Sequence, residues 1–215
     1  MLAFLGGTGP EGRGLALRLA LAGEAVAIGS RDAGRAAAVA DQLRQLAHGA
    51  RISGQENAGA ASQADVVFLT VPYEAQRPLL EQLVGALVGR VVVNVIAPMS
   101  FQRGRGASAV EVAAGSAAQE AQLLLPESLV VAAFQTVSAE ELQEPSKVME
   151  GDVIVCSDHP QAKGLVMELV KKIPDLRPVD GGGLVNAKYV EQLTPLLVNI
   201  NRIYKIHAGI KIVGL

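Results

Sequence analysis

The chain has 215 residues, half of them hydrophobic, and its 19 basic and 21 acidic residues leave a net charge of -2. This length is sufficient to bury a sizeable core, and the charge balance excludes the strongly basic surface of a typical nucleic-acid-binding domain. No apolar run reaches the roughly 18 residues of a membrane span, so no membrane partner is expected. The only cysteine, Cys156, excludes an intrachain disulfide. Because no basic leader precedes the first apolar residues, we expect a cytoplasmic protein without a secretion signal.

Short apolar segments, mostly β-branched, alternate along the chain with segments of helical periodicity. Such apolar segments predict strands that are covered on both faces, as in a parallel sheet. They are residues 2–6, 25–30, 66–72, 90–96, 129–134 and 152–157. The helical segments are residues 11–22, 33–48, 74–87, 108–124 and 160–172. This alternation predicts an α/β fold with a Rossmann-like, doubly wound and mostly parallel sheet.

The character of the sequence changes after Pro174. The stretch DLRPVDGGGLVN is rich in turn formers, and VNAKYVEQLTPLLVNINRIYK has the pattern of one long helix. We therefore expect residues 136–215 to form a smaller, mainly helical C-terminal part. It would pack against the sheet of residues 1–135 and close a substrate cleft.

Residues 7–12 read GTGPEG and match the pattern GxGxxG. Because they follow a predicted strand and open a predicted helix, they predict a dinucleotide-binding turn rather than an ordinary glycine-rich turn. Gly7 would permit the tight turn, Gly9 would let the backbone approach the pyrophosphate, and Gly12 would let the helix pack on the strand. The free amides at the helix N-terminus would then meet the phosphate charge.

The second predicted strand ends at Ser30 and Arg31, and Arg35 follows one helical turn later. An acid here would bind the ribose 2′-hydroxyl of NAD, whereas a hydroxyl and two guanidinium groups suit the 2′-phosphate of NADP. The alternative is a solvated basic helix start, which the helix dipole disfavours. The sequence therefore favours NADP, and we expect Asp32 to cap the next helix.

Five sequence stretches, by their order and spacing, are more specific for a protein family than the glycine pattern is. They are GGTGPEGRGLALRLALAG, the step GSR, TVPYEA, SAAQEAQLLLP and VEQLTPLLVNINR. Together they resemble the NADPH-dependent reductases of the deazaflavin coenzyme F420, over essentially the whole chain. The resemblance implies an oxidoreductase that transfers a hydride between C4 of nicotinamide and C5 of the deazaflavin.

The resemblance also implies which residues contact the two ligands. The implied NADP-binding residues are Gly7, Thr8, Gly9, Pro10, Glu11, Gly12, Ser30, Arg31, Arg35, Tyr73, Met99 and Ala139. The residues implied near the deazaflavin or the nicotinamide are Ser53, Gln135, Thr194 and Ala208. No catalytic acid or base is expected, because hydride transfer depends on stacking and orientation of the rings.

Two positions depart from the family pattern. The family has a histidine where this chain has Gln135, and a larger aliphatic residue where it has Ala208. Glutamine forms hydrogen bonds as histidine does, but it does not gain a proton near neutral pH. A flavin or another acceptor therefore stays open as an alternative to F420. The other functional class is a non-catalytic NADP-binding sensor or regulatory protein.

The remaining features carry less information. The three histidines have no metal-ligand spacing, so no metal site is expected, and the apolar run around Cys156 predicts a buried thiol. Residues 101–106 (FQRGRG) form either a solvated loop or a loop whose arginines meet an anionic substrate tail. A helical stripe predicts core or dimer interface, and we expect a homodimer. It consists of Leu193, Leu196, Leu197, Ile200 and Ile203.

Overall fold

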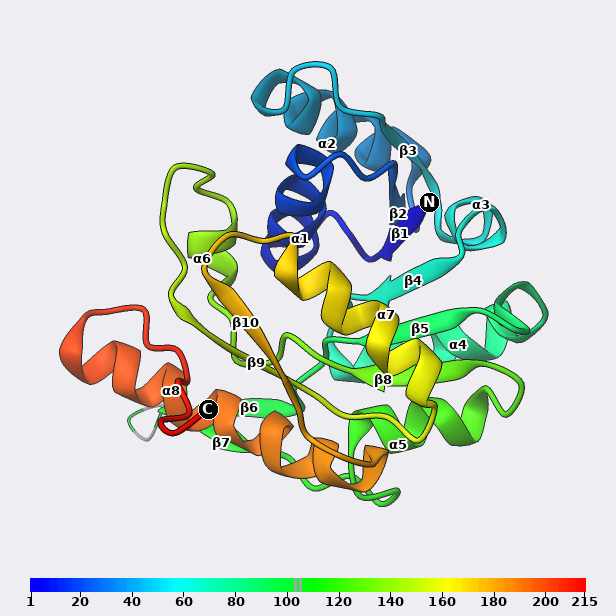
Figure 1. Cartoon of the computed structure of the whole chain (residues 1–215). Helices are drawn as coiled ribbons and strands as arrows, with labels where there is room; N and C mark the ends of the chain where they lie inside the picture. The colour runs from blue at the N-terminus through cyan, green and yellow to red at the C-terminus, as the bar shows by residue number, and fades with distance from the viewer. Residues whose placement is uncertain (103, 105) are drawn as a thin grey trace.

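A six-stranded parallel sheet forms the centre of the computed structural model, which describes residues 1–102, 104 and 106–215 (Figure 1). Its strands are β1 (Leu2–Leu5), β2 (Val26–Ser30), β3 (Ile52–Glu56), β4 (Val66–Leu69), β5 (Val91–Asn94) and β8 (Leu129–Ala132). They lie in the order β3-β2-β1-β4-β5-β8, and every pair is parallel. The strand order reverses between β1 and β4, the switch point at which open α/β sheets bind ligands.

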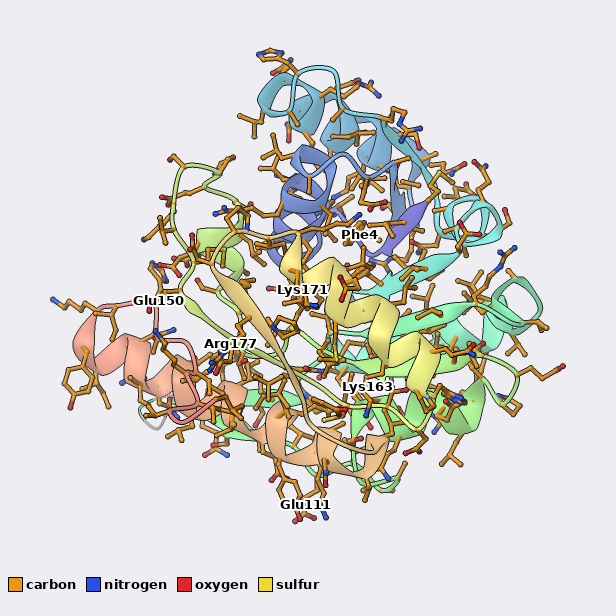
Figure 2. All side chains as sticks on the ribbon, viewed as in Figure 1. Phe4, Glu111, Glu150, Lys163, Lys171 and Arg177 are labelled. Carbon is orange, nitrogen blue, oxygen red and sulfur yellow. The ribbon has the colours of Figure 1, made fainter. Side chains whose placement is uncertain are left out.

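Helices cover both faces of this sheet, and each face buries its own apolar cluster. On one face lie α1 (Pro10–Leu21), α2 (Ala33–Leu46) and α7 (Pro160–Lys171). On the other lie α3 (Asn57–Gln63), α4 (Tyr73–Leu87) and α5 (Ala117–Leu124). Phe4, labelled in Figure 2, stacks on Phe68 with ring centroids 4.5 Å apart under the first face. Burial on both sides explains why the strands are continuously apolar, and the predicted fold class is confirmed.

The C-terminal part adds a second, smaller sheet. Its elements are α6 (Ala139–Leu142), β9 (Gly151–Val155), β10 (Leu176–Asp180), the 3₁₀ turn η1 (Leu184–Asn186) and α8 (Ala187–Tyr204). Strands β9 and β10 pair in parallel. Arg177 of β10, labelled in Figure 2, donates two bonds of 2.8 Å to the buried carboxylate of Asp152 and a third to the Ile212 carbonyl. These contacts fasten the C-terminal tail to the small sheet.

Two predicted elements need correction. Residues 152–157 do not join the main sheet as a strand. β9 pairs with β10, and the residues that follow it meet β8 through an isolated antiparallel bridge between Cys156 and Ala132 and a bond from the Ser157 hydroxyl to the Val130 carbonyl. Residues 108–124 are helical only from Ala117. Before it, β7 (Gly106–Ala109) pairs antiparallel with β6 (Met99–Gln102). Asn199 of α8 bonds both the N–H and the carbonyl of Ala107, which fixes this segment as a strand.

Buried polar side chains join the C-terminal part to the sheet domain. The Glu191 carboxylate of α8 accepts from the amides of Ala117 and Ala118 at 2.8 and 3.1 Å, and so caps the N-terminus of α5. Burial raises the pKa of Glu191 to about 7. On the other face, the buried Arg18 of α1 donates to backbone carbonyls between residues 141 and 147. The Glu191 contact therefore holds α8 against α5, and the Arg18 contact holds residues 141–147 against α1.

Membrane-spanning helices and metal-binding clusters are both absent from the described part of the chain. Within its described part, no helix combines the length and apolar character that a bilayer crossing requires. Among the same residues, no cluster of three or more histidine, cysteine or acidic side chains has the arrangement of a metal site.

Candidate nucleotide and substrate site

A cavity of about 370 Å³ lies at the carboxyl ends of the parallel strands. Its walls are the segments that follow β4, β5 and β8, namely residues 70–73, 95–97 and 134–140. Glu11, at the start of α1, lines it beside the switch point, and α8 and the tail contribute Thr194 and Ala208. The cavity therefore lies between the sheet domain and the C-terminal part.

The glycine turn leaves open space at one position only. A Cβ on Gly7 would lie 2.6 Å from the Phe4 carbonyl oxygen, and a Cβ on Gly12 would lie 2.6 Å from the Cα of Gly7. These two glycines are required by packing. A Cβ on Gly9 would meet no described atom closer than the Gly6 carbonyl oxygen at 3.7 Å. The space beside Gly9 is thus free for a ligand.

The tight turn itself is made by Gly6 rather than Gly7. Gly6 has a φ of +71°, a conformation that favours glycine. Its amide donates to Oδ1 of Asn57, the first residue of α3, at 3.2 Å. At the end of the turn, Gly9 is the N-cap of α1 and Pro10 is its first residue, with no side-chain cap. The helix N-terminus is left without a side-chain acceptor, as suits a phosphate.

The end of β2 carries the hydroxyl of the buried Ser30, followed by two exposed guanidinium groups. The Ser30 hydroxyl oxygen accepts from the Asp32 amide at 3.2 Å, and its own O–H is left to donate. Asp32 caps α2 by accepting from the Arg35 amide at 3.0 Å, as predicted. Arg31 and Arg35 are exposed, and neither side chain forms an ion pair within the described part of the chain. Both are therefore free to turn toward an anion.

Gln135 is a buried polar residue on the cavity wall. It is 4% exposed, and its Nε2 donates to the Asn94 carbonyl at 2.9 Å. Thr194 of α8 donates its hydroxyl to the Gln135 carbonyl at 2.9 Å. The preceding residue, Phe134, has a φ of +72°, which is strained for a residue with a side chain.

Known proteins resemble this chain in sequence and in fold. The model of the family described as NADP oxidoreductase coenzyme F420-dependent matches residues 1–98. The chain is 41% identical to an F420-dependent NADP reductase of Methanothermobacter marburgensis, over 100% of this chain and 98% of the relative. Identity to one of Methanocaldococcus jannaschii is 37%, over the same shares. The chain belongs to the F420-dependent NADP oxidoreductase family. A structure of a putative F420-dependent NADP reductase from Arthrobacter sp. FB24 has a TM-score of 0.85, with 25% identity over 98% of both chains.

In this family member the residues implied by resemblance fall into three places. Seven line the cavity: Glu11, Tyr73, Met99, Gln135, Ala139, Thr194 and Ala208. The glycine turn and the end of β2 hold most of the others. Ser53 lies apart, exposed on the edge strand β3, where its hydroxyl donates to the Val26 carbonyl at 3.5 Å. The arginines of the 101–106 segment, Arg103 and Arg105, lie outside the described residues.

Several residues of the reductase site had not been singled out from the sequence. Asn57 anchors the glycine turn, and Asn94 and Gln76 form a buried amide pair with an Nδ2–Oε1 distance of 2.7 Å beside Gln135. His207 lines the cavity mouth, with Nδ1 3.4 Å from the Ser138 hydroxyl. Buried amides have no periodic signal, so only their spatial convergence reveals them.

Glu11 is the acid nearest the helix N-terminus of this reductase site. Its Oε1 is buried without a hydrogen-bond partner in the described part of the chain. Burial raises the pKa of Glu11 from its usual 4.5 to about 8. The carboxyl is therefore protonated at neutral pH and presents no negative charge to a phosphate. By the same linkage, its contribution to folding stability declines as pH rises from about 4.5 to 8.

We predict that NADPH binding weakens above pH 8 because Glu11 then ionises beside the bound phosphates. A repulsion of about 1 kcal/mol corresponds to roughly a fivefold increase in the dissociation constant. The Glu11→Gln variant keeps the shape without the titration, so its affinity should stay constant between pH 7 and 9.5. Fluorescence titration of both proteins across this range measures the effect. Parallel pH profiles for the two proteins would contradict the role of Glu11.

Proposed function

We propose that this chain is an NADP-dependent oxidoreductase that transfers a hydride between NADP(H) and coenzyme F420. The observation that carries the proposal is the open space beside Gly9. Glu11, two residues later, lines a cavity that is large enough for ring systems. Membership of the family, and relatives whose names state F420-dependent NADP reduction over the whole chain, support the same activity.

Each part of the site has a place in this proposal. The amides after Gly9 hold the pyrophosphate, and Ser30, Arg31 and Arg35 hold the 2′-phosphate. Tyr73, Met99 and Ala139 line the path of NADP. Gln135, Thr194 and Ala208 bound the space where the rings stack, and the proposal omits Ser53 because it lies apart. The bound pair supplies the redox chemistry, with a hydride passing between nicotinamide C4 and deazaflavin C5.

The division of labour within the chain follows from this placement. Residues 1–135 bind the dinucleotide, and residues 136–215 close the cavity, because Thr194 and Ala208 face it from the C-terminal part. The protein orients the rings and excludes water, and no described side chain has to act as an acid or base. We place the enzyme in the cytoplasm, where a reducing environment suits the buried free thiol of Cys156; cell fractionation would check this.

The activity itself is tested by mixing NADPH, the protein and either oxidised F420 or flavin mononucleotide. We expect the visible absorbance of F420 to disappear at a rate proportional to enzyme concentration, with far slower loss of flavin absorbance. Faster reduction of the flavin would reassign the acceptor. Tight NADPH binding without turnover of either acceptor would instead indicate a nucleotide-binding sensor.

Cofactor preference is tested at the end of β2. Arg31→Ala removes a guanidinium from the 2′-phosphate, and a bond to a charged group contributes about 1.5 to 3 kcal/mol. We expect NADP affinity to fall by roughly 10- to 100-fold while NAD affinity hardly changes. Arg51→Ala, at an exposed arginine before β3, is the matched control. Equal affinity of the unmodified protein for NADP and NAD would refute the assignment.

We also propose that the enzyme is a homodimer joined through α8. The stripe expected from the sequence divides in two, since Leu197 lines the cavity whereas Leu196 and Ile203 are 53% and 71% exposed. Tyr189 precedes Leu196 by seven residues and is also exposed, so the three side chains share one helix face. An exposed apolar face of this kind is typical of a subunit interface.

Leu196→Asp should convert the dimer to a monomer, because a charge would be buried at the centre of the interface. Sedimentation or light scattering at micromolar concentration measures the mass. Leu123→Asp, at a leucine on α5 that is 73% exposed, should leave the mass unchanged. A monomeric unmodified protein would exclude the dimer outright.

A further inference from the structure

Gln135 carries a buried oxygen that lacks a hydrogen-bond partner. Its Oε1 is enclosed and bonds to no described residue, although the side chain lines the cavity. A buried acceptor left unpaired costs about 1 to 3 kcal/mol, so native structures rarely keep one without a reason. A partner that arrives from the cavity, with a small movement of the covering atoms, would remove this cost.

The orientation of the Gln135 amide is fixed by its neighbour. Its Nε2 faces the Asn94 carbonyl oxygen at 2.9 Å, and only the nitrogen of the amide can donate to a carbonyl. The opposite flip would place two acceptors against each other. Oε1 is therefore held on the other side of the amide as a pure acceptor at every pH at which the protein folds.

The Asn94 carbonyl is itself immobile. The Ala133 amide also donates to it, at 3.2 Å, so both of its lone pairs are in use. The Asn94 side chain accepts from the Ile96 amide at 3.0 Å and donates to Gln76 Oε1 at 2.7 Å. Gln76 in turn donates to the Ala117 carbonyl at 3.1 Å. Backbone groups at both ends of this network allow one orientation of each amide.

We infer that Gln135 Oε1 is a specificity-determining acceptor for an amide-type N–H on the redox ring bound in the cavity. The inference rests on the proposed function and deepens it. An N–H of this chemistry has two sources, the carboxamide of the nicotinamide and the ring N–H of the deazaflavin pyrimidine. A fixed acceptor favours rings that carry such a donor over rings of equal shape that lack it, because only the donor satisfies Oε1.

Two pairs of probes separate these sources in binding experiments. The first pair is NADPH and its 3-acetylpyridine analogue, in which a methyl ketone replaces the carboxamide. The second is the deazaflavin and its N3-methyl derivative. We expect the unmodified protein to bind the donor-bearing member of one pair about tenfold more tightly, the scale of one satisfied buried acceptor. The pair that shows the difference identifies the source.

Gln135→Met tests whether this residue causes the discrimination. It keeps the length of the side chain and removes the acceptor, so the ratio within the discriminating pair should fall close to one. Gln45→Met, at an exposed amide on α2, is the matched control and should keep the full ratio. Thermal unfolding checks the fold of the variant. The variant loses both the unpaired oxygen and the Nε2 bond to the Asn94 carbonyl, which act on stability in opposite directions, so thermal unfolding serves to confirm folding and the ratio decides the role.

Two outcomes would overturn the inference. They are ratios near one for both pairs in the unmodified protein, and a ratio that persists in Gln135→Met. The first needs no variant and decides the matter even if Gln135→Met fails to fold. The proposed function fails separately, if F420 is not reduced by NADPH. Reduction of F420 with ratios near one would refute the inference alone.

Discussion

The parallel sheet is the constraint from which the site follows. Because all six strands run in one direction, every loop that leaves a carboxyl end emerges on the same edge. The order β3-β2-β1-β4-β5-β8 then sends successive crossovers to opposite faces on the two sides of β1 and β4. Between β1 and β4 the two connections leave in opposite directions. The turn after β1 and the segment after β4 can therefore flank a ligand without covering it. The cavity occupies this edge.

A parallel sheet leaves its carboxyl edge open, and the C-terminal part is held over that edge by apolar packing together with buried polar contacts. Glu191 binds the first amides of α5, and Asn199 binds both backbone groups of Ala107. Directional bonds of this kind specify one position of α8, whereas apolar packing tolerates several. The apolar side chains of α8 serve three surfaces: Ala187 and Val190 join the core, Leu197 lines the cavity and Leu196 is exposed.

The amount of the fold that can be predicted from sequence depends on how strongly burial constrains each element. Strands covered on both faces were evident from their composition, and the glycine turn and Asp32 were placed correctly from local chemistry. The edge strand β3 reads ISGQE and is half exposed, so it lacks an apolar signal. The alanine-rich stretch before α5 predicts a helix, yet Gly106 has a φ of +88° and Asn199 pairs with its neighbour. Long-range contacts of this kind, like the amides around Gln135, are not visible in a local pattern.

Three departures from ideal structure line the cavity, while others, at Asp175, Lys205 and Gln119, lie elsewhere. Phe134 has a left-handed backbone, and Oε1 of both Glu11 and Gln135 is buried without a partner in the described part of the chain. Each feature costs stability, and all three residues line the same cavity. A fold optimised for stability alone would replace them with glycine or apolar side chains. Their presence in one place is the pattern expected where stability is given up to prepare a surface for ligands that complete its hydrogen bonds.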